Sequence, residues 1–494
     1  MRSSIYQFLV GCFAAIGSFL FGYDLFMLTS VEGVIAEVVA SDSFKASFLQ
    51  ENADSRSGTV VALFTAGCFC GAFLASYTDP LGRRRTILLA CCIFVVGGTI
   101  QTAGVIIAML YVGRLIAGIG VGFLTMIIPI YQAELAHRKI RGKITSLQQL
   151  FNALGQIFAT WIGYGCYMTW THTGNSREWR IPLGCQLVPA IFLGGLIMFF
   201  PESPRWLCAH DRADEGLQVL AQLHAHGDTS DSRVRADPVT DSRRKVAKSI
   251  GYFDLFRGWP NLRRTILVMA IQASCQMTGV SAIQYFSPQI FAQIGIPTSR
   301  SLLFQAVNAI IAFAGTTSVV DPTDIWTHLS LRDLRHQCSY HQGLPNDIEQ
   351  HKRSLGFRRH DMALQFCLFP YERTLELGHP SRAFGTAMRL KGVSWGAMTS
   401  FAFNTMIGQV TPIAISSIGW KFYLVFIVCN LTNAIFFWCF QPETKGLNLE
   451  DMDELLRDSP TFVPGSKWTP NSHVNELARE IAKGTKSRPS RHST

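Results

Sequence analysis

The sequence predicts an all-α protein that crosses a membrane many times, and three observations support this fold class. Hydrophobic residues make up 48% of the chain and charged residues only 16%, which is too apolar for an ordinary soluble domain. Apolar runs of roughly 20 residues, the length that spans a bilayer, recur along the chain. Basic residues concentrate in a few connecting segments, as in the cytoplasmic loops of membrane proteins. One polytopic bundle with a polar central loop therefore accounts for the 494 residues.

Ten apolar runs qualify as membrane spans by length and composition. In chain order they cover residues 8–28, 59–78, 86–107, 110–131, 145–167, 183–200, 264–291, 301–319, 393–416 and 420–440. The first run has no small-residue cleavage site, so we interpret it as a retained span and not as a cleaved signal. Small residues at i and i+4 in GRLIAGIGVG, residues 113–122, predict close packing of the fourth run on a neighbour.

The charged connections predict which side of the membrane each loop faces. The basic segments GRRR (82–85), HRKIRGK (137–143) and DSRRK (241–245) follow even-numbered runs, whereas the loop 31–58 is acidic on balance. By the positive-inside rule, both termini are cytoplasmic. The expected organisation is an N-terminal six-helix half at 1–200, a cytoplasmic central loop at 201–262, a C-terminal half at 263–456 and a disordered cytoplasmic tail at 457–494.

Residues 320–390 do not follow this pattern. The segment holds six of the thirteen histidines, and its one apolar run, MALQFCLF (362–369), is too short to cross a bilayer. The histidines have no i, i+4 pair and no nearby cysteine pair, so we expect no metal site; they are His328, His336, His341, His351, His360 and His379. The chain also has no GxxxxGK[ST] phosphate loop, which excludes a nucleotide-driven pump.

The thirteen cysteines have no disulfide or metal-ligand spacing. Most lie inside apolar runs, and we interpret them as small buried hydrophobic residues. They are Cys12, Cys68, Cys70, Cys91, Cys92, Cys185, Cys429 and Cys439.

Asp24 lies in the first apolar run, within FGYDLFMLTS (21–30), where a membrane helix ordinarily holds apolar side chains. An aspartate at the middle of a membrane helix costs about 2.5–3.5 kcal/mol on insertion scales, so it needs a compensating role. The deepest ionisable group elsewhere in the first half is Arg114. We expect the two to pair, because a paired carboxylate costs less to bury than a lone one.

Several motifs occur together in both halves of the chain. The first half contains FGYD (21–24), DPLGRRR (79–85), GR (113–114), YQAE (131–134), RG (141–142) and PESPRW (201–206). The second contains CQMTGVSAIQYFSP (275–288), RLKG (389–392) and PETKGLNLED (442–451). With these motifs the chain resembles the sugar porters of the major facilitator superfamily, most of all the fungal transporters of hexoses and disaccharides, over roughly residues 8–319 and 385–455.

This resemblance implies a major facilitator fold of twelve helices in two six-helix halves, around a central site that opens alternately to either face. Ten spans are found, and the missing helices 9 and 10 would fall at 320–390. The segment has about the length that two helices and their loops need. Because residues 320–390 keep the length of two helices but lose the apolar pattern, they indicate a shifted reading frame or mispredicted splicing.

The resemblance also implies roles for residues inside the spans. Proton-coupled members of the family carry an aspartate at the place of Asp24, so Asp24 and Arg114 are the expected proton-coupling pair. A carboxylate held permanently by arginine is the structural alternative.

Substrate binding is expected from amides and hydroxyls, which suit a neutral polyol because an amide both donates and accepts hydrogen bonds. The family pattern places such groups at Gln149, Gln276, Asn308 and Asn404. Gln156 follows Gln149 two turns later on nearly the same face, and Ser281 stands where the family usually has an asparagine. The chain departs from the pattern at Cys275, Ser281 and Ser400, which leaves the preferred sugar open. Taken singly, a buried glutamine is more often a helix–helix hydrogen bond than a ligand.

Charged residues at the cytoplasmic helix ends are expected to form a network that keeps this side closed. They are Arg83, Arg84, Glu134, Arg141, Glu202 and Arg205. A solvated positive-inside loop is the simpler explanation for Arg85 and Lys139. Exposed pairs contribute little singly, so only a connected network can act as a gate.

These observations predict a secondary active transporter that moves a neutral sugar or polyol by proton symport, and not an enzyme. We expect no cofactor and no nucleic-acid partner, a monomer in the lipid bilayer, and a multi-pass location in the plasma membrane. Two alternatives remain: a sugar sensor, although the tail after Leu456 is short for one, and an inactive product of a damaged or mispredicted gene.

Overall fold

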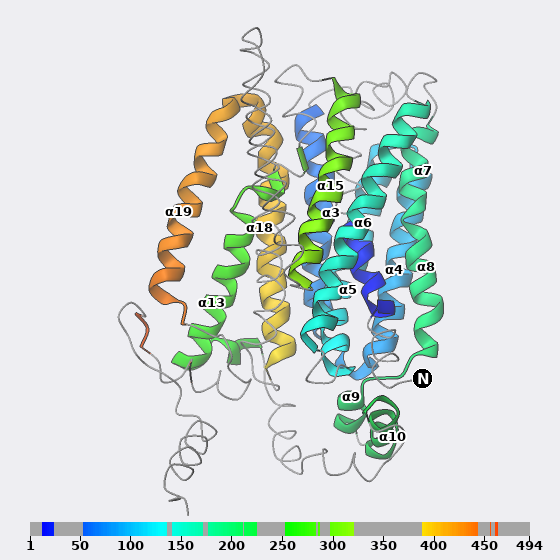
Figure 1. The fold of residues 1–494 in the computed structure, drawn as a ribbon, viewed down its shortest axis with the longest axis vertical. Coiled ribbons are helices and arrows are strands. Elements are labelled where there is room, and N and C mark those ends of the chain that lie inside the picture. Colours follow the sequence, from blue (N-terminus) through cyan, green and yellow to red (C-terminus); the bar gives the residue numbers. More distant parts are fainter. Residues whose placement is uncertain are drawn as a thin grey trace, which may run out of the picture.

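The structure is a computed structural model that describes residues 12–23, 53–135, 141–170, 176–210, 212–224, 252–282, 285–286, 297–320, 388–442, 455 and 460–462. Within these ranges the regular structure is entirely helical, and the long helices run side by side as one bundle (Figure 1). The all-α fold class predicted from the sequence is therefore correct.

All ten predicted spans fall on described helices. The first half has the helix Cys12–Tyr23, α3 (Ala53–Ala75), α4 (Arg83–Ala103), α5 (Ile107–Leu135), α6 (Arg141–Trp170), and the consecutive α7 (Arg177–Cys185) and α8 (Leu187–Leu196), followed by η3 (Ile197–Phe199). The second half has α13 (Trp259–Gln276), α15 (Thr298–Val320) and α18 (Arg389–Ile418), then η5 (Gly419–Phe422) and α19 (Tyr423–Phe440).

The helices differ in how apolar they are. Within the described part of the chain, six spans are long and apolar enough to cross a membrane: Gly58–Ala75, Arg83–Ala103, Ile107–Gln132, Arg177–Phe199, Trp259–Ala282 and Tyr423–Phe440. Cys12–Tyr23 and Ser299–Ala314 are apolar but shorter. The remaining two, α6 and α18, are 30 residues each and interrupt their apolar sequence with buried amides and hydroxyls. A polar helix inside a bundle marks a functional face.

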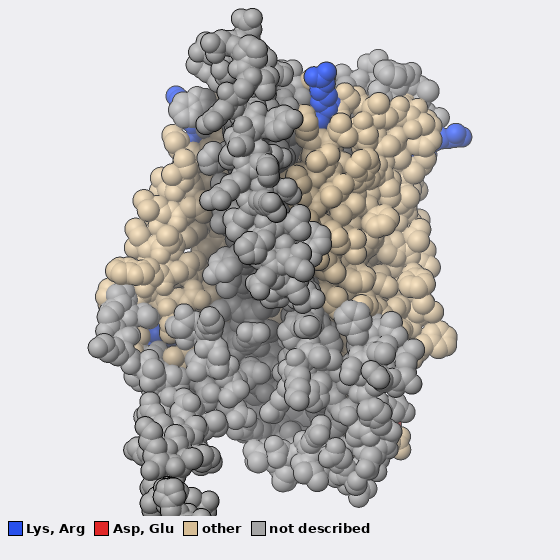
Figure 2. Space-filling model, viewed as in Figure 1, with Lys and Arg blue, Asp and Glu red and all other residues tan. Residues whose placement is uncertain are grey.

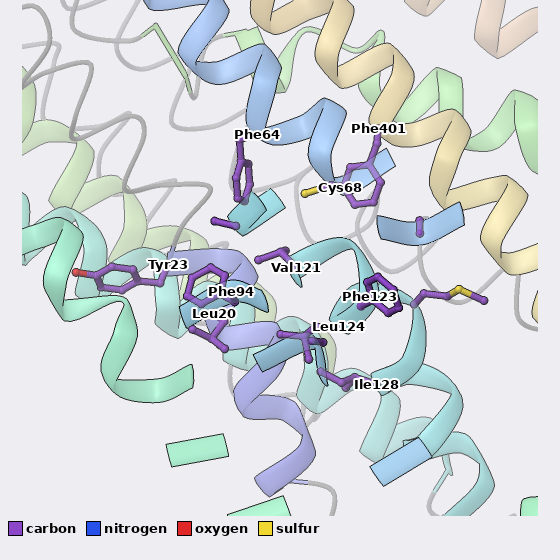
Figure 3. Close-up of a cluster of buried hydrophobic side chains, with 14 of the residues drawn as sticks. Leu20, Tyr23, Phe64, Cys68, Phe94, Val121, Phe123, Leu124, Ile128 and Phe401 are labelled. Atoms are coloured by element: carbon purple, nitrogen blue, oxygen red, sulfur yellow. The ribbon is translucent and has the colours of Figure 1, made fainter. Parts of the chain in front are cut away.

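The core lies mainly in the first half, where α5 packs against both α3 and α4, and α4 packs against α8. The two halves meet along two seams, α18 against α3 and α6 against α15, while α13 packs on α18. Figure 3 shows the first of these seams, with Phe401 of α18 beside Cys68 of α3. Residues more than 300 positions apart thus share one hydrophobic cluster.

The small residues of the fourth run allow α3 and α5 to approach closely, as predicted. A Cβ at Gly67 would lie 2.4 Å from the Leu115 carbonyl oxygen, and one at Gly118 would lie 2.2 Å from that of Phe64. Such distances leave no room for a side chain. The packing interpretation of GRLIAGIGVG is therefore confirmed.

The outer surface of the bundle is apolar. Large hydrophobic side chains point outward on α8, η3 and α19, among them Ile191, Phe199 and Trp438. On the face shown in Figure 2, the described surface has Lys and Arg only near its ends and shows no Asp or Glu. Cys70 and Cys92 are exposed on this kind of surface, so the prediction that they are buried was wrong: they face outward from apolar helices.

The region 201–262 contains helices that the sequence did not indicate. These are α9 (Pro204–Ala209), α10 (Ala213–His224) and η4 (Tyr252–Leu255). The hydroxyl of Ser203 caps α9 by accepting a hydrogen bond from the Trp206 backbone N–H at 3.3 Å. Both α9 and α10 lie at the lower end of the bundle in Figure 1. We call this end, where residues 76–85 also lie, the basic end.

Several sequence-based predictions concern residues outside the described ranges. These are Asp24, the segment 321–387 and most of the tail. Of the tail, the described part includes Pro460, whose carbonyl oxygen accepts a hydrogen bond from Arg263 Nη2 at 2.9 Å.

Candidate functional site

One face of α6 carries a row of buried polar side chains. Gln148, Gln149, Asn152, Gln156 and Thr160 are all buried, and most of them recur at intervals of three or four residues. Burying an amide is costly unless it makes hydrogen bonds, so this row must face other polar groups or a ligand. Gln149 and Gln156, both predicted from the sequence, belong to the row.

The neighbouring helix of the other half, α15, is polar in the same way. Ser301, Gln305 and Thr316 are buried, and Asn308 is partly buried. Because α15 packs against α6, the predicted residue Asn308 and the predicted glutamines of α6 lie on two helices in contact. This seam joins polar groups of both halves.

Gln276 is held by two hydroxyl groups. Its Nε2 donates to Ser400 Oγ at 2.9 Å, and its Oε1 accepts from Ser281 Oγ at 3.0 Å. The two bonds determine which way the amide points and link α13 to α18.

Asn404 is oriented by a residue that the sequence did not single out. The Tyr285 hydroxyl donates to Asn404 Oδ1 at 2.8 Å, and both side chains are buried. The bond leaves the Asn404 amide N–H groups directed away from Tyr285. Tyr285 lies within CQMTGVSAIQYFSP, where its hydroxyl was the available signal.

Other buried amides were also missed. Asn152 and Gln148 precede Gln156 by four and eight residues, so helical spacing on α6 could have identified them. Gln272 stands one turn before Gln276 on α13, and Gln305 lies on α15. Together with the predicted residues, these groups place buried amides on four helices, α6, α13, α15 and α18.

Arg114 of α5 is completely buried, as expected for a functional charge. Its guanidinium carbon lies 6.0 Å from the centre of the Phe64 ring on α3, within range of a cation–π contact. Asp24 lies outside the described residues, one position beyond the helix Cys12–Tyr23. That helix packs on α6, since a Cβ at Gly22 would meet the Asn152 carbonyl oxygen at 2.1 Å. The Asp24–Arg114 pair stays a prediction.

At the basic end, Arg83 is the centre of a charge network. Its Nε and Nη2 each lie 3.1 Å from a different carboxylate oxygen of Glu134, and its Nη1 bonds Asp79. The side chains of Arg83 and Glu134 are only 9% and 12% exposed, so water screens this pair weakly. Because two parallel hydrogen bonds join the guanidinium of Arg83 to the carboxylate of Glu134, they also fix the relative orientation of the two groups.

Glu202 joins the same network through the backbone. Its two carboxylate oxygens accept from the N–H groups of Arg83 at 3.1 Å and Arg84 at 3.2 Å, at the N-terminus of α4. Helix N-termini favour negative charge. The approach requires Gly82, whose φ is +83° and whose added Cβ would lie 2.8 Å from Glu202 Oε2.

Two further bonds attach α9 and the end of the sixth span to this network. Trp206 Nε1 donates to the Asp79 carbonyl at 2.6 Å, and the Tyr131 hydroxyl donates to the Pro201 carbonyl at 2.7 Å. Of the six predicted network residues, the structure thus brings together Arg83, Arg84, Glu134 and Glu202. The side chains of Arg141 and Arg205 lie outside the described residues.

No group of three or more His, Cys, Asp or Glu residues in the described part of the chain could hold a metal ion. The histidine-containing segment 321–387 lies outside those residues.

A family model described as "Sugar (and other) transporter" matches residues 10–323 and 379–456 of the chain. The stretch between the two matches lies inside the segment 320–390 that interrupts the pattern of spans. The extent of the predicted resemblance is therefore confirmed.

The chain is similar to "MFS-type transporter criB" of Aspergillus cristatus, with 32% identity over 92% of this chain and 94% of that protein. It is also similar to "High-affinity glucose transporter" of Kluyveromyces lactis, with 29% identity over 95% and 88% of the two chains. Among solved structures, the proton:xylose symporter XylE bound to 6-bromo-6-deoxy-D-glucose has a TM-score of 0.71 and 22% identity, covering 92% of this chain and 100% of that one. At this identity the likeness shows the fold alone.

Proposed function

The chain belongs to the sugar transporter family of the major facilitator superfamily, and from this we propose that it moves a neutral sugar or polyol across a membrane by proton symport. The observation that carries the proposal is the set of buried amides and hydroxyls on α6, α15, α13 and α18. A polyol needs many donors and acceptors and no countercharge.

Gln149, Gln156, Asn308, Gln276, Ser281 and Asn404 are the proposed substrate-binding residues. Two of them have orientations set by neighbours: Gln276 by Ser281 and Ser400, and Asn404 by Tyr285. Because these side chains are already oriented before a sugar binds, binding loses less conformational entropy. Their orientation also favours one arrangement of sugar hydroxyls over its epimers, because a mismatched hydroxyl leaves a buried amide unsatisfied.

Transport follows from relative movement of the two halves. The halves touch along the α3–α18 and α6–α15 seams, and substrate residues lie on both halves. Opening one end of the seams exposes the site to one side of the membrane. The network of Arg83, Glu134 and Glu202 stiffens the first half at the basic end, which we assign to the cytoplasm.

Proton coupling is assigned to Asp24 with Arg114 as partner. Protonation of the carboxylate would release the arginine and so favour one open state over the other. The buried position of Arg114 on α5, close to Phe64 of α3, supports a location inside the first half.

The test is uptake of labelled sugars into vesicles, with and without an imposed pH gradient, by a version of the chain in which residues 320–390 encode the two missing spans. We expect accumulation above equilibrium with the gradient and equilibration without it. Asp24→Asn should keep exchange of sugar but lose uphill accumulation, whereas Asp214→Asn, on the exposed start of α10, should behave as wild type. Uphill accumulation by Asp24→Asn would contradict the coupling assignment. Specific sugar binding without any uptake would favour the sensor.

A further inference from the structure

A cluster at the basic end joins the two halves through one residue of the central region. Tyr252 begins η4, and its hydroxyl donates to Ser76 Oγ at the end of α3. The same hydroxyl lies 3.2 Å from Ser394 Oγ near the start of α18. A single phenol therefore contacts both halves, 176 residues away in one direction and 142 in the other.

The hydrogens of this cluster can be accounted for one by one. Ser76 Oγ donates to the Phe73 carbonyl at 2.7 Å, and Ser394 Oγ donates to the Ala72 carbonyl at 2.8 Å. Each serine hydroxyl has one proton, so each can only accept from Tyr252. The proton of the Tyr252 phenol is thus the donor that the two serines share. Burial raises the pKa of this phenol, which keeps it protonated.

The ring of Tyr252 is also enclosed by both halves. The rings of Phe73 and Tyr77, at the end of α3, lie 5.7 and 5.8 Å from it between centres. On the other side are Trp395 at 6.4 Å and the Lys391 ammonium at 5.7 Å, both from α18. Separating α3 from α18 at this end would break contacts on one side of the ring.

The backbone of η4 shows which half carries the ring. Thr265 of α13 donates through its Oγ1 to the Leu255 carbonyl at 3.0 Å, and Leu255 packs with Val268 of α13. Asn261 donates to the Asp254 carbonyl at 3.4 Å. Since η4 is attached to α13, Tyr252 moves with the second half and reaches across to α3.

We propose that Tyr252 is a latch that holds the two halves together at the basic end and sets how often that end opens. The latch rests on the proposed alternating-access transport, because only relative movement of the halves gives it a function. The phenol proton links Tyr252 to Ser76 at the end of α3 and is shared with Ser394 of α18. Removing that proton should favour the state open at the basic end.

The test is hydrogen–deuterium exchange of the full chain in lipid nanodiscs, which requires neither substrate nor transport. Tyr252→Phe keeps the ring and removes the shared proton. We expect exchange about two- to tenfold faster in peptides covering residues 72–78 and 391–398, the effect of losing one hydrogen bond. At the opposite end of the seam, around Gly58 and Pro412, exchange should become slower, because opening one end closes the other.

Two further variants make the outcome decisive. Tyr77→Phe removes a hydroxyl from the same aromatic cluster that takes part in none of the hydrogen bonds described around Tyr252, and it should match wild type. Ser394→Ala removes the bond to the Ala72 carbonyl and should shift exchange in the same direction as Tyr252→Phe. Unchanged exchange at the basic end, or faster exchange at both ends, would overturn the latch. If the version with both spans restored transports no sugar while the full chain shows the expected exchange, only the proposed function is overturned.

Discussion

Two membrane spans, α3 in the first half and α19 in the second, differ greatly in how much of their surface other parts of the chain cover. Within their membrane spans, 61% of the residues of α3 are buried but only 6% of those of α19. Both helices are apolar enough to cross a bilayer. The difference shows that apolar composition makes a helix a span, whereas neighbouring helices make it part of a core.

The chain offers a reason for this difference. On its inner side α19 packs against α13, and Phe426 is its buried contact residue. The family model leaves residues 324–378 unmatched.

The largest effect should come from supplying the second half with its two spans. We expect the chain as printed to reach the membrane poorly and to transport little or no sugar. A version in which residues 320–390 encode two apolar helices should be active, because each lipid-facing charge or unpaired amide costs kilocalories. The measurement is proton-driven uptake into vesicles that contain equal amounts of each protein. Equal rates would show that the printed segment supports a complete second half.

Substitution of a proposed binding residue in either half should weaken sugar binding. Gln149→Ala on α6 and Gln276→Ala on α13 should each weaken sugar binding by about 1–3 kcal/mol, up to roughly a hundredfold, because buried sugar hydroxyls lose a partner. Half-saturation of uptake measures this loss. Gln101→Ala is the control, since Gln101 is equally buried but donates to the Gly113 carbonyl at 3.1 Å within the first half. Unchanged half-saturation in both site variants would place the site elsewhere.

A smaller effect is expected from glycine substitutions at the start of one helix in each half, α4 and α13. Gly82→Ala and Gly258→Ala both force alanine into a positive φ, at +83° and +85°, a strain of about 1–3 kcal/mol each. Only Gly82→Ala also drives a methyl group against the Glu202 carboxylate, whereas nothing lies within 4 Å of the added Cβ at Gly258. We expect the larger fall in thermal melting temperature for Gly82→Ala. Equal falls would mean that the Glu202 contact contributes no stability.

The smallest effect should come from matched valine-to-alanine substitutions in the spans α3 and α19. Val61→Ala on α3 removes two methyl groups from a completely buried site beside Gly408 of α18, for an expected loss of about 1–3 kcal/mol. Val428→Ala on α19, where the valine is 60% exposed, should change stability by less than about 0.5 kcal/mol. Thermal unfolding in one detergent compares them. A comparable loss at Val428 would reveal a partner for the outer face of α19.

The sequence by itself determined the spans and the motif at the basic end. A span depends on local apolar length, so all ten runs could be located without neighbours. Arg83, Glu134 and Glu202 were found because each lies in a compact motif at a helix end. The short helices α9 and α10 were missed, since they are too brief for periodicity to separate them from a polar loop.

Only the tertiary structure decided which polar groups meet. Gln276 and Ser400 are 124 residues apart, Tyr285 and Asn404 are 119 apart, and Tyr252 and Ser76 are 176 apart. No spacing rule reaches over such distances, because hydrogen bonds between helices depend on how the helices cross and rotate. The sequence therefore showed which residues can form hydrogen bonds, and the packing of α3, α13 and α18 determined which of them do.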